Sequence, residues 1–346
     1  MKKINIFFIH SSHDVLILMS LFQEKYIDDA DSKIFVFKTF DKNFNFLLSN
    51  FNNISYLKSN SLFDKINFFN LIKDEFNKAK LNYEINYYAS DYLNFISNYI
   101  FRLSNINKHL MSHGTANYID KNNCTHRHKY FYRKSNLLLY LFSRIIDRIY
   151  YRSKQFLILL FCFKIYDPFF LHISGHDRIS FDFGYFYSLD NLCTKTKKDI
   201  KLKLPKTNLI ELPKKDFILF LENIDSPSYR DPSIRKIISN KLNMINSDII
   251  IHKPHLNLEG KKVKKLNTSK KIILVDPKIP AEFYIPHNRE IYIVGCESSV
   301  LIYAKIINKN NKVICYDDLF DVADNYKKLY LKYSIEIIDV VKKRIV

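Results

Sequence analysis

Short apolar runs alternate with helix-patterned segments along this chain of 346 residues, and this alternation limits its fold more than any other feature. In the first half the strand-like runs are 3–9, 33–38, 54–57, 84–89 and 109–112. The spacing of amphipathic helices marks 13–27, 62–79 and 91–103. Strands that alternate with helices form a parallel sheet with helices on both faces. The sequence therefore predicts an α/β fold.

The same alternation returns in the second half. Its strands are expected at 217–221, 248–252, 271–275, 290–295 and 312–316, and its helices at 232–246 and 298–308. Residues 194–215 are rich in lysine, contain proline and lack aromatic residues, so we interpret them as an interdomain linker. The expected organisation is one Rossmann-like domain over 1–205 and a second over 206–346, facing a central cleft.

Composition narrows the class of protein. With 47% hydrophobic and 15% aromatic residues, an intrinsically disordered chain is excluded. The net charge of +19 predicts a polyanionic neighbour, which is nucleic acid, an anionic membrane or a charged substrate. The five dispersed cysteines lack zinc-site spacing and are typical of reduced thiols in the cytoplasm. The apolar run after Met1 is too short for a signal peptide.

Residues 124–171 interrupt the α/β pattern. Two helical apolar runs, Leu137–Phe142 and Phe156–Phe163, are interleaved with arginine and lysine, and neither is long enough to span a bilayer. We interpret this stretch as a basic helical insertion of the N-terminal domain. It would lie on the anionic inner face of the cytoplasmic membrane, as a peripheral contact. An ordinary helical excursion packed on the domain is the alternative.

Glycine is scarce, and this excludes the usual nucleotide loops. The chain has five glycines, too few and too scattered for a GxGxxG fingerprint or a Walker A loop. A phosphate would therefore need side chains and a plain helix N-terminus. Gly295 ends an expected strand and would permit a tight turn after it. Ser298 and Ser299 begin the next helix, where the N–H groups and the helix dipole favour an anion. A serine cap without a ligand is the alternative.

A second set of polar residues follows the strand at 248–252. His255 lies at the carboxyl end of this strand, where open α/β sheets bind ligands, and Lys253 adds positive charge. Glu282, after Pro280, could accept hydrogen bonds from the two hydroxyl groups of a ribose. The alternative is that its carboxylate only stabilises the start of a helix. With the serines, these residues predict a site for a nucleotide phosphate and its ribose.

The first half offers a candidate general base. The stretch Leu110–Tyr118 is an apolar strand that delivers His113 into a loop at the carboxyl edge of the sheet. An imidazole there is suited to proton abstraction near neutral pH. His10 and His13, which leave the first strand at the same edge, are its rivals, and a structural loop histidine is the alternative.

Metal binding is poorly supported. Asp29 and Asp31 match a DxD pattern, but they fall at an expected helix end rather than after a central strand. Asp317 and Asp318, after the last expected strand, are similarly weak. No metal site and no cofactor are predicted.

Together these motifs resemble those of the bacterial GT-B sialyltransferases and polysialyltransferases. Lys253-Pro-His255 looks like their histidine motif, Pro280-Ala-Glu282 like the segment that meets the cytidine ribose, and Ser298-Ser299 like their serine motif. Ser112–Tyr118 is similar to their base motif, with His113 at the acidic position, which also resembles the His-Gly-Thr of teichoic-acid glycerophosphate polymerases. Leu256 departs from the family's proline after the histidine.

The resemblance implies an inverting, metal-independent glycosyltransferase that moves sialic acid, or a related acidic sugar, from a CMP donor to a cell-surface glycan or glycolipid such as lipooligosaccharide or capsule. His113 would be the base, with Asp231 or Glu222 as substitutes, and His255 would stabilise the leaving CMP together with the serines. A CDP-glycerol-type or Kdo transferase is the nearest alternative. A nucleic-acid-binding protein is disfavoured, because the basic density lies beside apolar helices or in the linker.

Overall fold

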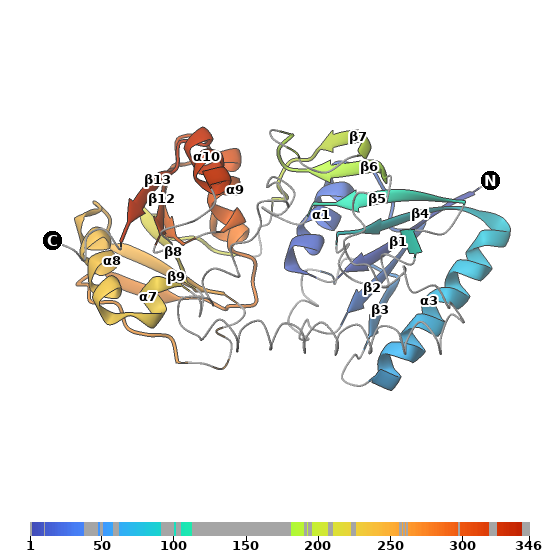
Figure 1. The fold of residues 1–346 in the computed structure, drawn as a ribbon, viewed down its shortest axis with the longest axis horizontal. Coiled ribbons are helices and arrows are strands. Elements are labelled where there is room, and N and C mark those ends of the chain that lie inside the picture. The colour runs from blue at the N-terminus through green and yellow to red at the C-terminus, as the bar shows by residue number, and fades with distance from the viewer. Residues whose placement is uncertain are drawn as a thin grey trace, which may run out of the picture. The chain divides into compact units, whose positions relative to one another are not determined.

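The fold consists of two parallel α/β units. The computed structural model describes residues 2–9, 11–37, 51–57, 62–90, 105–112, 181–189, 196–206, 210–222, 226–255, 262–296, 298–317 and 324–340, with a few isolated positions besides. The chain divides into two compact units, and Pro205 is the last residue of the first unit before Lys206 of the second (Figure 1).

The first unit is built on a seven-stranded sheet in which every strand pair is parallel. Its strands are β1 (Lys2–Ile9), β2 (Ser32–Phe37), β3 (Ile54–Leu57), β4 (Tyr83–Ala89), β5 (Ile106–Met111), β6 (Phe181–Phe186) and β7 (Thr196–Lys201). The strand order is β3-β2-β1-β4-β5-β6-β7. The order reverses between β1 and β4, as in doubly wound folds, and the carboxyl ends of these strands are where such folds bind ligands.

Two helices bury the apolar side chains of β1. The long α3 (Leu62–Asn82) runs along one side of the sheet in Figure 1 and shares a core cluster with Ile6 and Phe8. Phe7 points to the other face, where it contacts Phe22 of α1 (Ser12–Gln23). Successive strand residues face opposite ways, so an apolar run without alternation is buried on both faces.

The second unit repeats this design with six strands, again all parallel. They are β8 (Phe217–Glu222), β9 (Ile249–Pro254), β10 (Lys271–Leu274), β11 (Tyr292–Gly295), β12 (Lys312–Asp317) and β13 (Glu336–Asp339). The order is β10-β9-β8-β11-β12-β13, so the reversal falls between β8 and β11. The switch point of this unit therefore lies at Glu222 and Gly295, the last residues of those two strands.

Among the described residues, five helices accompany the second sheet. They are α7 (Pro227–Arg230), α8 (Pro232–Met244), the 3₁₀ helix η7 (Ala281–Tyr284), α9 (Ser299–Ile307) and α10 (Asp324–Lys332). Asp231 caps α8 by accepting a hydrogen bond from the backbone N–H of Ser233 at 2.8 Å, and Pro232 opens the first turn. Three apolar residues of α8, Ile234, Ile238 and Leu242, are buried in the core against β8 and β9.

A polar stripe of α8 supports the crossover from β9 to β10. Arg235, Ser239 and Asn243 are spaced four residues apart, so they lie on one face of the helix. The guanidinium of Arg235 donates to the carbonyls of Lys264 and Lys265, and Ser239 Oγ accepts from the N–H of Asn267 at 3.2 Å. Asn243 donates to the Asn267 carbonyl at 3.3 Å. Over residues 262–270 this crossover has no helix, so side chains of α8 supply backbone partners that a helix would supply internally.

The α/β prediction is confirmed, but several elements differ from expectation. Residues 194–215, expected to be a linker, contain the edge strand β7 at Thr196–Lys201. The elements β6, β13, α7 and α10 were not predicted. The helix expected at 91–103 lies mostly outside the described residues, and the basic stretch at 124–171 lies wholly outside them.

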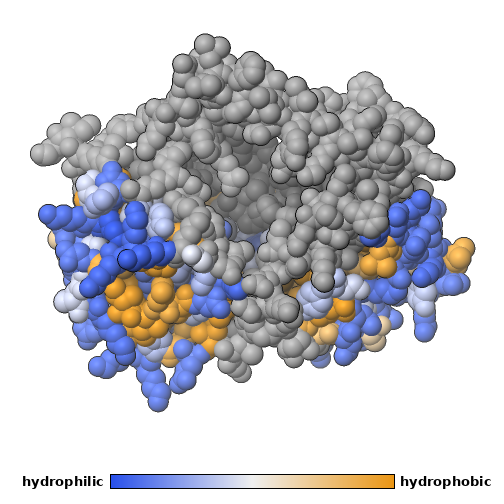
Figure 2. Space-filling view, turned by 90° about the horizontal axis from the view of Figure 1, so that it is seen from below, coloured by the Kyte–Doolittle hydropathy of each residue, from blue (hydrophilic) through white to orange (hydrophobic). Residues whose placement is uncertain are grey.

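The described surface mixes apolar and polar side chains. Figure 2 shows apolar patches set between hydrophilic residues. Large exposed apolar side chains of the second unit include Met244, Leu274 and Leu331. Among the helices that the structure describes, none is long and apolar enough to cross a bilayer.

Candidate functional site at the carboxyl edge of the second sheet

His255 directly follows β9, with its backbone hydrogen-bonded to the sheet and its side chain exposed. The three isoleucines Ile249–Ile251 pair with β8 and hold β9 in the sheet. Directly after the strand, the backbone N–H of His255 donates to the carbonyl oxygen of Glu222 at 2.7 Å. The end of β9 is thereby tied to the end of β8, while the His255 side chain remains exposed. An exposed imidazole next to the switch point can hydrogen-bond or protonate an anionic ligand.

Lys253 is buried rather than directed to solvent. Its Nζ donates to the carbonyls of Pro254 and Pro277, at 2.6 and 3.0 Å. Burial lowers the pKa of Lys253 to about 8, and the carboxylates of Glu282 and Asp276 partly offset that effect. The amine therefore links β9 to the chain that leads into η7, and its influence on a ligand would come through its electric field.

Glu282 lies in η7 and is also buried. Burial raises its pKa, while a hydrogen bond from its own backbone N–H and the positive charge of Lys253 act in the opposite direction. Lys253 and Glu282 thus influence each other electrostatically, and burial shifts both toward their neutral forms. In this arrangement the carboxyl group faces protein, so contact with a ribose would require η7 to move.

Ser298 and Ser299 lie where the sequence placed them, at the start of α9. Ser298 is the N-cap, and its Oγ accepts from the backbone N–H of Val300 at 3.2 Å. Its own N–H donates to the hydroxyl of Tyr330 at 3.0 Å. A serine hydroxyl that accepts a capping bond keeps its O–H as a donor, so it can still donate to a phosphate oxygen. The helix packs against η7, the element that carries Glu282.

Gly295 serves close packing rather than a turn that needs unusual dihedral angles. It is the last residue of β11 and is buried beside β8. A Cβ at this position would lie 2.9 Å from Cβ of Leu221, closer than real side chains approach. The glycine was expected to permit a tight turn, whereas the structure shows that it allows β11 and β8 to approach at the switch point.

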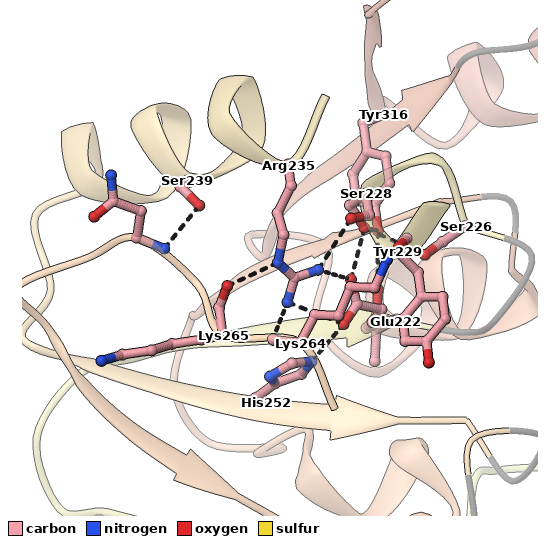
Figure 3. A network of polar contacts seen from close by, with 12 residues as sticks. Glu222, Ser226, Ser228, Tyr229, Arg235, Ser239, His252, Lys264, Lys265 and Tyr316 are labelled. Atoms are coloured by element: carbon pink, nitrogen blue, oxygen red, sulfur yellow. Dashed lines mark hydrogen bonds and ion pairs between the residues drawn. The ribbon is translucent and has the colours of Figure 1, made fainter. Parts of the chain in front are cut away.

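A buried ionic network, which the sequence did not predict, underlies this edge (Figure 3). Arg235 Nη1 donates to Glu222 Oε1 at 2.5 Å, and Ser228 Oγ donates to the same oxygen at 2.9 Å. On the other oxygen, His252 Nε2 donates at 3.0 Å. Burial raises the pKa of Glu222, but hydrogen bonds from His252 and Arg235 and the charge of Arg235 more than offset this, so the pKa is lowered overall. The carboxylate is therefore ionised, with donors on both oxygens.

The network extends to β12 and α7. Tyr316 Oη lies 3.1 Å from Ser228 Oγ and 3.2 Å from the carbonyl of Leu221, and Ser226 Oγ lies 3.2 Å from Ser228 Oγ. Glu222 is consequently shielded from solvent, which argues against its use as a general base. Asp231, the other substitute for that role, acts as the cap of α8.

The histidines predicted for the acceptor side lie partly outside the described residues. His113, the expected base, and His10 lie outside the described residues. His13 lies in the first turn of α1 and meets the ring of Tyr187 edge-on at 5.8 Å. Asp29 accepts from the backbone N–H of Asn52 at 3.2 Å, a contact between loops. Among the described residues, no group of three or more His, Cys, Asp or Glu could hold a metal ion.

Comparison with known proteins identifies the fold. No protein-family model and no curated protein sequence matches the chain. Among solved structures, UDP-N-acetylglucosamine 2-epimerase from Listeria monocytogenes matches with a TM-score of 0.56 and 11% identity, over 99% of this chain and 87% of that one. The S. aureus MnaA–UDP co-structure gives 0.53 and 9%, over 99% and 87%. A sialyltransferase from Photobacterium damsela gives a weaker match, 0.45 and 14%, over 97% and 81%.

These likenesses show that the chain has a GT-B-like fold of two Rossmann-like units. Their low sequence identities extend the conclusion no further than the fold.

Proposed function

We propose that this protein is a nucleotide-sugar-dependent glycosyltransferase that moves sialic acid, or a related acidic sugar, from a CMP donor to a glycan acceptor. Residues 206–346 would bind the donor, and residues 1–205 would bind the acceptor. The proposal also draws on the resemblance of Lys253–His255, Pro280–Glu282 and Ser298-Ser299 to the sialyltransferase motifs.

The observation that carries the proposal is the position of His255. It follows β9, which neighbours β8, and β8 neighbours β11 at the switch point. Neighbouring strands are about 4.8 Å apart, so the ends of β9 and β11 are separated by about 10 Å. A phosphate between them would have the His255 imidazole on one side and the start of α9 on the other. Open α/β sheets bind their ligands at this place.

The proposed chemistry follows from these groups. As the sugar leaves, negative charge develops on the phosphate of CMP, and an imidazolium at His255 would donate a hydrogen bond or a proton to it. Ser298 and Ser299 would donate from hydroxyl and N–H groups at the positive end of α9. CMP carries a single phosphate, so these donors would suffice without a metal. His113 would remove the proton of the acceptor hydroxyl.

The test is to incubate the protein with CMP-sialic acid and to measure hydrolysis or transfer, with and without EDTA. We expect turnover in both conditions, and we expect His255→Ala to reduce kcat by about 10²–10⁴-fold, the usual range for a general acid. His287→Ala is a matched control, because His287 is also exposed but precedes β11 at the opposite edge of the sheet. Full activity in His255→Ala would contradict the leaving-group role.

A UDP-N-acetylglucosamine 2-epimerase is the second candidate. It is favoured by structural matches to such epimerases above a TM-score of 0.5 that span nearly the whole chain. A further match above 0.5 is a co-structure with UDP. NMR detection of a 2-epimer formed from UDP-N-acetylglucosamine, without any activity on CMP-sialic acid, would favour this candidate over transfer.

Donor competition separates the remaining alternatives. Inhibition by CDP-glycerol, or turnover of CMP-Kdo, would indicate a transferase of those types instead. For the proposed peripheral contact with the inner face of the cytoplasmic membrane, flotation with anionic liposomes should exceed retention on DNA at physiological salt. The reverse result would favour nucleic-acid binding.

A further inference from the structure

We propose that Glu222 is a positioning residue that holds His255 in place at the switch point. The catalytic role of His255 in this inference rests on the proposed function. The contacts between Glu222 and the end of β9 lie within the second unit, so they can be tested without a substrate.

Glu222 accepts hydrogen bonds from the end of β9 both through its backbone and through its side chain. Its backbone carbonyl accepts from the N–H of His255 at 2.7 Å. Its side-chain Oε2 accepts from His252, three residues earlier, at 3.0 Å. One residue therefore restrains the strand before and after Pro254, its partner in the β8–β9 register. The backbone of His255 cannot shift without breaking at least one of these contacts.

Glu222 is in turn held by elements from three other parts of the unit. Arg235 approaches from α8 and Ser228 from α7, while Tyr316 of β12 contacts both Ser228 and the carbonyl of Leu221. Figure 3 shows these side chains converging on the Glu222 carboxylate. Arg235 and Ser228 donate to Oε1 and His252 donates to Oε2, so the carboxylate, held at both oxygens, has little rotational freedom. A catalytic group supported in this way keeps its geometry before a ligand arrives.

The energetic cost of the network also points to a geometric role. A buried ion pair is expensive to desolvate, and apolar residues of similar volume often stabilise a fold equally well. Stability alone therefore gives little reason for an ionised carboxylate at the end of β8, a strand whose residues are all buried. Directional hydrogen bonds fix one arrangement more strictly than apolar packing does.

The same arrangement excludes the simpler explanation that Glu222 acts on a substrate directly. Both of its oxygens have donors, and its side chain is fully buried. A substrate could reach it only after Arg235 and His252 had moved. Its action on a reaction must therefore pass through the residues that it holds.

The test compares Glu222→Gln with a destabilised control, Leu242→Ala, a core residue of α8 that is not part of the Glu222 hydrogen-bond network. The first readout is the imidazole resonances of His255 in the ligand-free protein, assigned with His255→Gln. We expect Glu222→Gln to shift or broaden them, and we expect no change in Leu242→Ala. Unchanged His255 resonances in folded Glu222→Gln would overturn the proposal.

The second readout is turnover of CMP-sialic acid. Loss of a supporting hydrogen bond should lower kcat by about 10–100-fold with little change in KM. If Glu222→Gln does not fold, His252→Gln and His252→Met replace it, because only the glutamine amide can still donate to Glu222. We expect His252→Gln to retain kcat and His255 resonances, and His252→Met to lose both. Equal behaviour of the two variants would overturn the proposal. A shift of the His255 resonances without any turnover in the unmodified protein would contradict the proposed function but support the positioning role.

Discussion

His109 and His252 occupy similar positions in the two sheets and are used in different ways. Each lies on an inner strand, β5 or β9, and their exposed fractions are 5% and 2%. His109 stacks on Tyr88 and Phe183, with ring centroids at 4.2 and 4.9 Å. His252 instead faces the carboxylate of Glu222.

The surroundings determine the charge of each site. Burial lowers the pKa of His109 to about 3, so its ring is neutral at ordinary pH. Its Nδ1 meets the hydroxyl of Tyr185 at 2.9 Å, while Nε2 has no hydrogen-bond partner in the described structure. In the second unit a carboxylate and a guanidinium accompany the histidine, and every oxygen of the carboxylate is satisfied. Similar burial thus gives a packing residue in one sheet and part of an ionic support in the other.

The largest expected effect comes from breaking the ionic support. Arg235→Met leaves the Glu222 carboxylate buried without its cation, so the free energy of unfolding should fall by about 3–5 kcal/mol. Urea denaturation measures this. The double variant Glu222→Leu/Arg235→Met, which removes both charges, should recover a substantial part of the loss. A single variant that loses less than about 1 kcal/mol would show that the network is not ionised as described.

His252→Phe should have a smaller effect. It removes the nearer donor of Glu222 Oε2 and leaves only the longer contact from Arg235 Nη2 at 3.4 Å, and a poorly satisfied buried acceptor costs about 1–3 kcal/mol. The loss should be much smaller when Glu222→Leu is already present, because no acceptor then remains. A double-mutant cycle by urea denaturation measures this coupling, and additive effects would contradict it.

The two sites should also differ in acid sensitivity. The unfolded chain binds a proton at His109 near pH 6.5, whereas the folded chain does so only near pH 3. Stability should therefore fall as the pH drops below 6.5, by about 1.4 kcal/mol per pH unit from this residue. The lowered pKa of Glu222 stabilises the fold above its ordinary value of 4.5, and this contribution is lost only below that value. Unfolding at pH 7, 6 and 5 should show a shallower slope in His109→Phe than in the unmodified protein.

His109→Phe should change stability least when it is measured at pH 7.5. The phenyl ring fits a stack of aromatic side chains, and no buried charge loses its partner. Tyr185 keeps an interaction with Tyr88. We expect a change within about 1 kcal/mol, in either direction, by thermal or urea denaturation. A loss as large as that of His252→Phe would erase the distinction between the two histidines.

Much of the fold could be predicted because the apolar runs are continuous. Strands such as Phe217–Glu222 are buried on both faces, and this gives them a clear signal in the sequence. The edge strand β7 was missed because Thr196–Lys201 is polar and mostly exposed. Lysine is common on edge strands, where it prevents pairing with other chains. The short strand β13, Glu336–Asp339, carries too few residues for a periodic signal.

The candidate site was only partly accessible from sequence. Local patterns located Ser298 and His255, because each lies next to an apolar run. The partners of Glu222 are far apart in sequence, and only the order of the strands brings them together. One sign was available, namely a glutamate that continues the wholly apolar run Phe217–Leu221 without a break. An acid in such a position needs a buried partner.

The polar stripe on α8 has a consequence for the local unfolding of the second unit. Arg235, Ser239 and Asn243 hold the backbone of the β9–β10 crossover, which over residues 262–270 has no backbone hydrogen-bonded turn of its own. This segment cannot keep its amides protected once the helix detaches. In hydrogen exchange, the N–H of Asn267 should therefore exchange together with the amides of α8, as one cooperative unit.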